Sequence, residues 1–186
     1  MHRGSIGFVL ASCWATAAAA QTVGEWTTQA PLPGLVIGHR VAEGGSLIIE
    51  RIPRGETVQD WSRMVTTQRF AGVIARGGTL DEWHGHFIES LRNGCPGYRA
   101  SPTVRVGTGA RPALEFRIDC PRNPATGRPE VFLLRAIAGT ADLHVAQVAF
   151  RHVPTAVETA WARRQLDSVT FCTRRSRLPA CSAGPE

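Results

Sequence analysis

Four cysteines constrain this chain more than any other feature of its sequence: Cys95, Cys120, Cys172 and Cys181. The chain has five cysteines, and Cys13 is discounted because it lies in the predicted signal peptide. The even set that remains predicts disulfides in an exported chain, and four cysteines allow three pairings. We favour Cys95–Cys120 and Cys172–Cys181, because each pair flanks a loop-rich stretch of sequence. The alternative is a zinc site, but the four cysteines lack the close C-x-x-C spacing that such sites usually have.

The N-terminal segment predicts export. The chain starts with the positive tripeptide MHR and continues with the apolar stretch IGFVLASCWATAAAA. Small residues lead up to Ala20, as they do before a cleavage site, so residues 1–20 are predicted to be a signal peptide and the protein to be periplasmic or secreted. The alternative is a lipoprotein, because LASC resembles a lipobox in which Cys13 would carry the lipid anchor.

The remaining chain has the size of one ordinary domain. Residues 21–181 are predicted to form a single domain, and residues 182–186 are predicted to be a disordered tail. No segment after the signal peptide is apolar enough to span a bilayer.

Arginine takes the place of lysine throughout the chain. The sequence has 21 arginines, no lysine and a formal net charge of +6. The absence of lysine excludes Schiff-base chemistry on a lysine side chain. Most of the arginines are scattered beside acidic or apolar residues. We therefore expect no nucleic-acid partner, and only a weak peripheral association with anionic surfaces.

One cluster of arginines is a candidate binding site. Arg174, Arg175 and Arg177 lie in the segment between Cys172 and Cys181. Guanidinium groups bind carboxylates and phosphates through paired hydrogen bonds. These arginines are therefore the predicted contacts with a partner protein or an envelope component. A solvated basic loop is the alternative.

A helix is predicted within residues 54–70. Thr57 and Asp60 resemble a capping box at its start. Apolar residues then recur at helical spacing on one face, which consists of Val58, Trp61, Met64, Val65 and Gln68. Trp61 and Met64 would anchor this helix on a sheet.

The other elements follow from apolar spacing, alternation and turn residues. After Gln21 comes a polar lead that precedes the turn APLPG. Strands are predicted at residues 35–41, 46–52, 103–106, 113–119, 131–139 and 142–153, with a closing segment at 169–172. Helices are predicted at residues 79–94, with Thr79 as N-cap, and after Thr155. The inner side of the last helix is predicted to consist of Val157, Ala160 and Trp161. Helices segregated from antiparallel hairpins predict an α+β fold, in which helices pack against an antiparallel sheet.

One segment resembles a known group of proteins. The motif E-x-I-P-x-G-E at residues 50–56, followed by W-x-x-M-x-T-x-Q at residues 61–68, is similar to a group of uncharacterised exported proteins of proteobacteria. The order of elements also resembles the PsbP-like α/β sandwich, a fold of non-catalytic accessory and binding proteins. The resemblance implies a binding or accessory module, and it carries no functional residue onto this chain.

Histidines are the remaining candidates for chemistry. His84 and His86 could chelate zinc or copper on a strand, but two such positions diverge by about 200° within a helix. A periplasmic metal-binding protein that uses this pair is one alternative function. A hydrolase-like enzyme is the other, with His144 or His152 beside a carboxylate and a hydroxyl in a cleft. His144 shares a predicted strand face with apolar neighbours, which is typical of a structural histidine.

No catalytic site and no cofactor are expected from these patterns. The predicted function is therefore that of an exported, non-enzymatic envelope protein, a small binding or accessory module with an unknown partner.

Overall fold

The structure of the protein is a computed structural model, and it describes residues 24–108 and 111–185. The predicted signal peptide and the alternative lipid attachment at Cys13 lie outside these residues.

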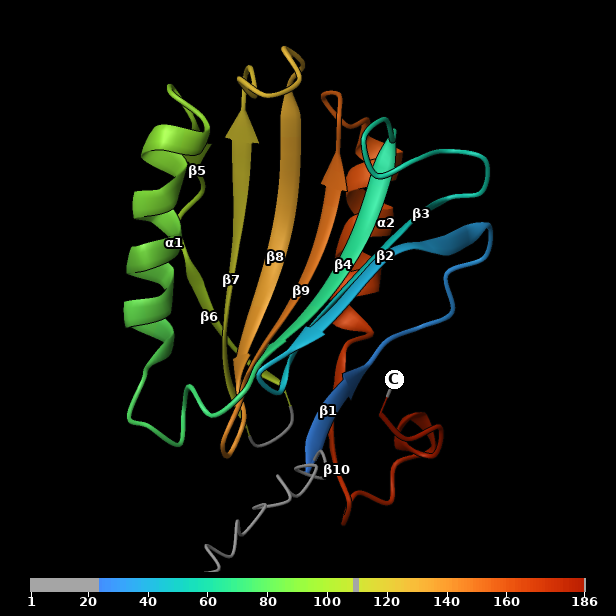
Figure 1. Cartoon of the computed structure of the whole chain (residues 1–186), viewed down its shortest axis with the longest axis vertical. Coiled ribbons are helices and arrows are strands. Elements are labelled where there is room, and N and C mark those ends of the chain that lie inside the picture. Colours follow the sequence, from blue (N-terminus) through green and yellow to red (C-terminus); the bar gives the residue numbers. More distant parts are fainter. Residues whose placement is uncertain (1–23, 109–110, 186) are drawn as a thin grey trace, which may run out of the picture.

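A large antiparallel sheet forms the centre of the fold (Figure 1). Its strands are β2 (Leu35–Glu43), β3 (Ser46–Pro53), β4 (Arg63–Phe70), β5 (Arg99–Ala100), β6 (Val104–Thr108), β7 (Arg111–Cys120), β8 (Glu130–Ala138) and β9 (Leu143–Phe150). They lie in the order β2-β3-β4-β9-β8-β7-β5, and β6 pairs with β7. A second sheet pairs β1 (Glu25–Thr28) with β10 (Thr170–Thr173) and so joins the two ends of the described chain.

Each face of the large sheet carries one helix. The helices are α1 (Leu80–Gly94) and α2 (Ala156–Asp167). α1 packs through Trp83 against a core that includes Leu134, and α2 packs through Leu166 against a second core that includes Leu133. Successive side chains of a strand point to opposite faces, so the two helices cover opposite sides of β8. In Figure 1, α1 lies beside β7 and α2 lies behind the sheet. The predicted α+β fold class is confirmed.

Both helices begin with the same side-chain arrangement. Thr79 Oγ1 accepts a hydrogen bond from the backbone N–H of Glu82, and the Glu82 carboxylate accepts one from the backbone N–H of Thr79. Thr155 and Glu158 repeat this capping box at the start of α2. The predicted N-cap at Thr79 and the predicted β2–β3 and β8–β9 hairpins are confirmed.

The helix predicted within residues 54–70 is wrong. Residues 54–62 form turns and bends, and the strand β4 follows them. The backbone N–H of Asp60 does donate to Thr57 Oγ1 at 3.1 Å, as in a capping box. The backbone N–H of Thr57 also donates to the carbonyl of Asp60, so the pair closes a tight turn instead of opening a helix.

The burial of β4 explains why the strand was not predicted. β4 lies between β3 and β9, and Met64, Val65 and Thr66 are all buried. A strand buried on both faces loses the alternation of apolar and polar residues, and short apolar runs are then ambiguous. The predicted burial of Trp61 and Met64 is confirmed, although neither lies on a helix.

The predicted inner side of α2 is wrong for two of its three residues. Val157 and Ala160 are exposed and Trp161 is half-buried. The buried residues of the helix are Ala162, Gln165 and Leu166. The packing of the helix on β8 and β9 buries this side, which includes a glutamine and is therefore not the most apolar one.

The polar lead after Gln21 contains an element that was not predicted. β1 has only four residues, EWTT, and its partner β10 lies near the other end of the chain. So short a strand shows no clear alternation, and only the pairing with β10 defines it.

Two disulfides fix both ends of the fold. Cys95, directly after α1, is bonded to Cys120 at the end of β7, and Cys172 in β10 is bonded to Cys181. This is the pairing that the sequence favours. Disulfides persist in oxidising compartments, so they indicate an extracytoplasmic environment. None of the helices in the described part of the chain is both long and apolar enough to cross a membrane.

The segment after the second disulfide is short. Cys181 ends a single turn of 3₁₀ helix, η1 (Pro179–Cys181), and residues 182–184 continue as a turn. The disorder predicted for residues 182–186 stays a prediction, and residue 186 lies outside the described residues.

Candidate functional site

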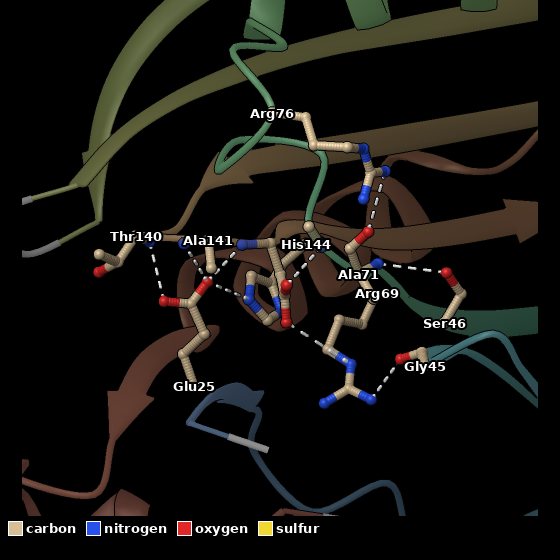
Figure 2. Close-up of polar contacts among 11 residues, drawn as sticks. Glu25, Gly45, Ser46, Arg69, Ala71, Arg76, Thr140, Ala141 and His144 are labelled. Atoms are coloured by element: carbon tan, nitrogen blue, oxygen red, sulfur yellow. Dashed lines mark hydrogen bonds and ion pairs between the residues drawn. The ribbon is translucent and has the colours of Figure 1, made fainter. Parts of the chain in front are cut away.

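β1 carries a buried carboxylate to the turn of the β8–β9 hairpin. Glu25 is only 5% exposed. Its Oε2 accepts the backbone N–H of Thr140 at 2.8 Å, and its Oε1 accepts those of Ala141 at 3.0 Å and Asp142 at 2.7 Å (Figure 2). Gly139 opens this turn, and a Cβ there would lie 2.2 Å from Glu25 Oε1. The hairpin turn is therefore shaped to receive the carboxylate.

A buried histidine faces the same carboxylate. His144 lies in β9 and is 2% exposed, and its ring packs edge-on against Phe171 of β10. Its Nε2 lies 3.6 Å from Glu25 Oε1 and has no hydrogen-bond partner. That separation is too long for a well-formed hydrogen bond, so a buried polar nitrogen is left unsatisfied.

The surroundings of Glu25 favour its ionised form. Burial by itself raises the pKa of the carboxyl group, but the facing His144 and three backbone N–H donors outweigh it and lower the pKa to about 2. Glu25 is consequently a carboxylate at neutral pH.

A second carboxylate completes the cluster. Asp142 Oδ1 accepts the backbone N–H of Gly72 at 2.7 Å. Asp142 Oδ2 lies 3.9 Å from Nε of Arg69, whose guanidinium also donates to the carbonyl of Gly45. One donor atom from each of Glu25, Asp142 and His144 lies within 4.8 Å of the other two. In residues 24–108 and 111–185, this is the one group of three metal-ligating side chains that lie so close together.

A small cavity adjoins the cluster. Its volume is about 40 Å³, and Trp26, Arg69 and His144 are among the residues that line it. Nε1 of Trp26 and Nε of Arg69 are, like Nε2 of His144, buried and without a hydrogen-bond partner. Three unsatisfied nitrogen atoms therefore belong to residues around one space, which is large enough for a water molecule.

The predicted histidine pair does not form such a cluster. His84 and His86 both lie within the continuous helix α1. His84 is half-buried, and its Nε2 lies 3.3 Å from the hydroxyl of Thr103. The side chain of His86 is exposed. The helix turns the two rings away from each other, so they cannot bind one ion together.

The predicted arginine cluster lies on an exposed loop. Arg174, Arg175 and Arg177 are exposed, and the loop is closed by the Cys172–Cys181 disulfide and by hydrogen bonds between Thr173 and Ser176. Its role in binding a partner stays a prediction.

A further pocket contains the groups that a hydrolase would need, but they have other partners. His152 and Ser62 both line a pocket of about 310 Å³. The Ser62 hydroxyl donates to Glu56 at 2.7 Å, and the His152 ring pairs with Glu158 at 3.0 Å. A serine nucleophile is activated by a histidine within hydrogen-bond reach, whereas these two residues engage separate carboxylates.

Sequence reasoning named only one member of the buried cluster. His144 was a candidate only for the hydrolase alternative, and its apolar strand face is typical of a structural histidine. Glu25 and Asp142 were missed, because one lies in the polar lead and the other in a hairpin turn. The one available signal was the segment EWTT, in which Glu25 precedes three residues that are common in strands. No protein-family model matches the chain, and a search of curated proteins finds no match.

Proposed function

We propose that the protein is an exported, non-enzymatic binding module that accepts an extended segment of a partner protein along the edge strand β2. One observation carries this proposal: β2 is nine residues long, it is the end strand of the large sheet, and its last seven residues are exposed. An edge strand presents unpaired backbone N–H and C=O groups, with which another extended chain can pair.

The two ends of the sheet differ in this respect. The outer side of β7 is occupied by β5, which has two residues, and by β6, which has five. β2 pairs with β3 on one side, and within the described residues no strand pairs with its other side. The long open edge is therefore the side that can accept an additional strand.

The side chains of β2 suit a specific partner. Ile37 is 56% exposed and Val41 is 40% exposed, so two large apolar side chains stand on the open strand. Arg40 lies between them in sequence, and the register with β3 shifts between Ile37 and His39. A charge and a bulge on an edge limit pairing with other chains, so a partner segment must complement both Arg40 and the apolar side chains.

The environment of the protein supports this function. Two disulfides agree with an oxidising compartment, and the periplasm or the exterior of a bacterial cell is the location that we propose. The resemblance of the element order to the PsbP-like sandwich supports an accessory role by analogy of fold.

A matched pair of variants tests the role of β2. The double variant Ile37→Asp/Val41→Asp places charge on the open edge, and Val157→Asp places it on another exposed apolar site, on α2. Tagged mature protein would be used to capture partners from the envelope fraction, with quantitative mass spectrometry and circular dichroism to verify folding. We expect a partner that is retained by wild type and by Val157→Asp and lost from the double variant. Equal capture by all three proteins would contradict docking at β2.

A further inference from the structure

We propose that Glu25, Asp142 and His144 bind one divalent transition-metal ion, with zinc as the first candidate. This site is separate from the edge strand β2 and from the predicted His84–His86 pair, so its test does not depend on the proposed function.

The three donor atoms are close enough to converge on a single ion. Zn–N and Zn–O bonds are about 2.1 Å long, so two ligands of a tetrahedral zinc ion lie about 3.4 Å apart. The three donor atoms here lie within 4.8 Å of one another, so binding draws the most distant pair together by up to about 1.4 Å.

The unsatisfied nitrogen of His144 is an independent indication of a ligand. Nε2 is buried, has no hydrogen-bond partner and faces Glu25 Oε1 at 3.6 Å. Two ligands of a tetrahedral zinc ion lie about 3.4 Å apart. The separation is thus long for a hydrogen bond but close to that expected for two ligands of the same ion.

Backbone groups already hold the two carboxylates in place. Glu25 accepts three backbone N–H groups from the β8–β9 turn, and Asp142 accepts that of Gly72. Outer contacts of this kind fix the orientation of metal ligands. The cluster is therefore ordered before an ion arrives, which lowers the entropic cost of binding.

The charges also agree with a divalent cation. Two carboxylates and a neutral imidazole ligand supply a charge of −2, and the Arg69 guanidinium, whose Nε lies 3.9 Å from Asp142 Oδ2, reduces it to a net −1. An imidazole nitrogen favours zinc and its neighbours in the first transition row over magnesium and calcium, which prefer oxygen ligands alone. The cavity of about 40 Å³ that His144 lines has room for a water molecule.

Titration of the mature, disulfide-bonded protein with zinc chloride tests the proposal. The protein would first be treated with a chelator and then studied by isothermal titration calorimetry in a buffer that does not bind metal. We expect one zinc ion per chain and a rise in melting temperature on binding. We expect His144→Ala to weaken binding at least about 100-fold, since loss of even an outer contact costs about 10–100-fold.

Two further variants keep the test decisive. His84→Ala/His86→Ala should bind zinc as wild type does, because those residues lie on α1 and not in this cluster. Asp142→Asn retains an oxygen that can accept the Gly72 N–H but removes the negative charge, so it should fold and bind weakly even if His144→Ala fails to fold. An absence of stoichiometric binding by wild type would overturn the proposal, as would unchanged affinity in a folded His144→Ala or Asp142→Asn variant.

Discussion

Trp61 is buried although it lies in no helix or strand. It lies in the loop before β4, yet it belongs to the core beneath α1. The guanidinium of Arg151 lies over its ring, 4.3 Å from the centre. The side chain thus belongs to the core and also contacts a cation.

Substitution of Trp61 by Ala should therefore be costly. We expect Trp61→Ala to lower the free energy of unfolding by about 3–5 kcal/mol, because a buried aromatic side chain leaves a cavity when it is removed. Urea denaturation followed by circular dichroism would measure the change. Val157→Ala, at a site that is 76% exposed, is the control and should change stability by less than about 0.5 kcal/mol. A loss of less than about 1 kcal/mol for Trp61→Ala would show that the tryptophan does not fill the core.

Glu158 links stability to pH at the start of α2. The backbone N–H of Thr155, the Thr155 hydroxyl and His152 together lower the pKa of Glu158 below its usual value, against a smaller opposing effect of burial. A carboxylate whose pKa is lowered by folding stabilises the protein above the usual carboxyl range, and this contribution is lost as the pH falls through the lowered pKa. Glu158→Gln keeps a side chain that can close the capping box but removes its charge, so it should reduce stability at pH 7 by about 0.3–1 kcal/mol.

The pH dependence of this loss separates the contribution of the Glu158 charge from that of the other contacts of its side chain. The difference between wild type and Glu158→Gln should shrink on acidification and vanish below the lowered pKa, as measured by urea denaturation at a series of pH values. Glu82→Gln is the matched control, because Glu82 holds the same position in the capping box of α1. A difference for Glu158→Gln that stayed constant with pH would mean that the charge of Glu158 does not contribute.

A single arginine joins α2 to the sheet. Arg135 lies in β8 and is 8% exposed, and its guanidinium contacts Glu115 of β7, the carbonyl of Leu166 and the carboxylate of Asp167. The last two contacts are at the C-terminal end of α2, where the helix dipole favours a positive charge. The position of this helix end therefore depends on Arg135.

Removal of that guanidinium should loosen the helix end. We expect Arg135→Met to cost about 1–3 kcal/mol, because it leaves the buried Leu166 carbonyl and the partly buried Glu115 carboxylate without this donor. Hydrogen exchange of the last turn of α2 should accelerate at the same time. Arg105→Met is the control: Arg105 pairs with Asp81 at 2.7 Å, but both side chains are about two-thirds exposed, and such pairs contribute at most about 1 kcal/mol. Equal effects of the two substitutions would contradict this account.

The elements that were predicted correctly are those that local sequence defines. α1 has a capping box at Thr79 and an apolar stripe that includes Trp83 and Phe87, and both features are independent of the rest of the chain. The segment of β4 has a similar stripe, in Trp61, Met64 and Val65, but its β-branched residues pair with β3 and β9 on either side. Tertiary pairing thus overrides a helical pattern that the segment carries by itself.

At the scale of the whole molecule, the candidate metal site is a product of long-range pairing. β1 reaches the β8–β9 turn only because it pairs with β10, which follows α2 in the chain. Glu25 and Asp142 are separated by 117 residues (142 − 25), and no local pattern relates them. The sequence could therefore offer His144 as a candidate, while the carboxylates that surround it follow only from the folded arrangement of both sheets.

The two disulfides should contribute unequally to the stability of this arrangement. Cys95–Cys120 closes a loop with a sequence separation of 25 and ties α1 to β7, whereas Cys172–Cys181 has a separation of 9. Loop entropy in the unfolded chain then predicts contributions of about 3.5 and about 2.6 kcal/mol. Urea denaturation of the two double variants, Cys95→Ala/Cys120→Ala and Cys172→Ala/Cys181→Ala, would measure the losses.

The disulfide that closes the shorter loop, Cys172–Cys181, lies beside the strand that carries Glu25, so the comparison also tests whether it acts on the folded protein. Cys172 belongs to β10, which holds β1 and therefore Glu25 in place. If unfolded-state entropy governs both losses, the shorter loop will cost less stability, as calculated. A larger loss for Cys172→Ala/Cys181→Ala would instead mean that the disulfide acts on the folded protein, by holding the small sheet against the β8–β9 turn.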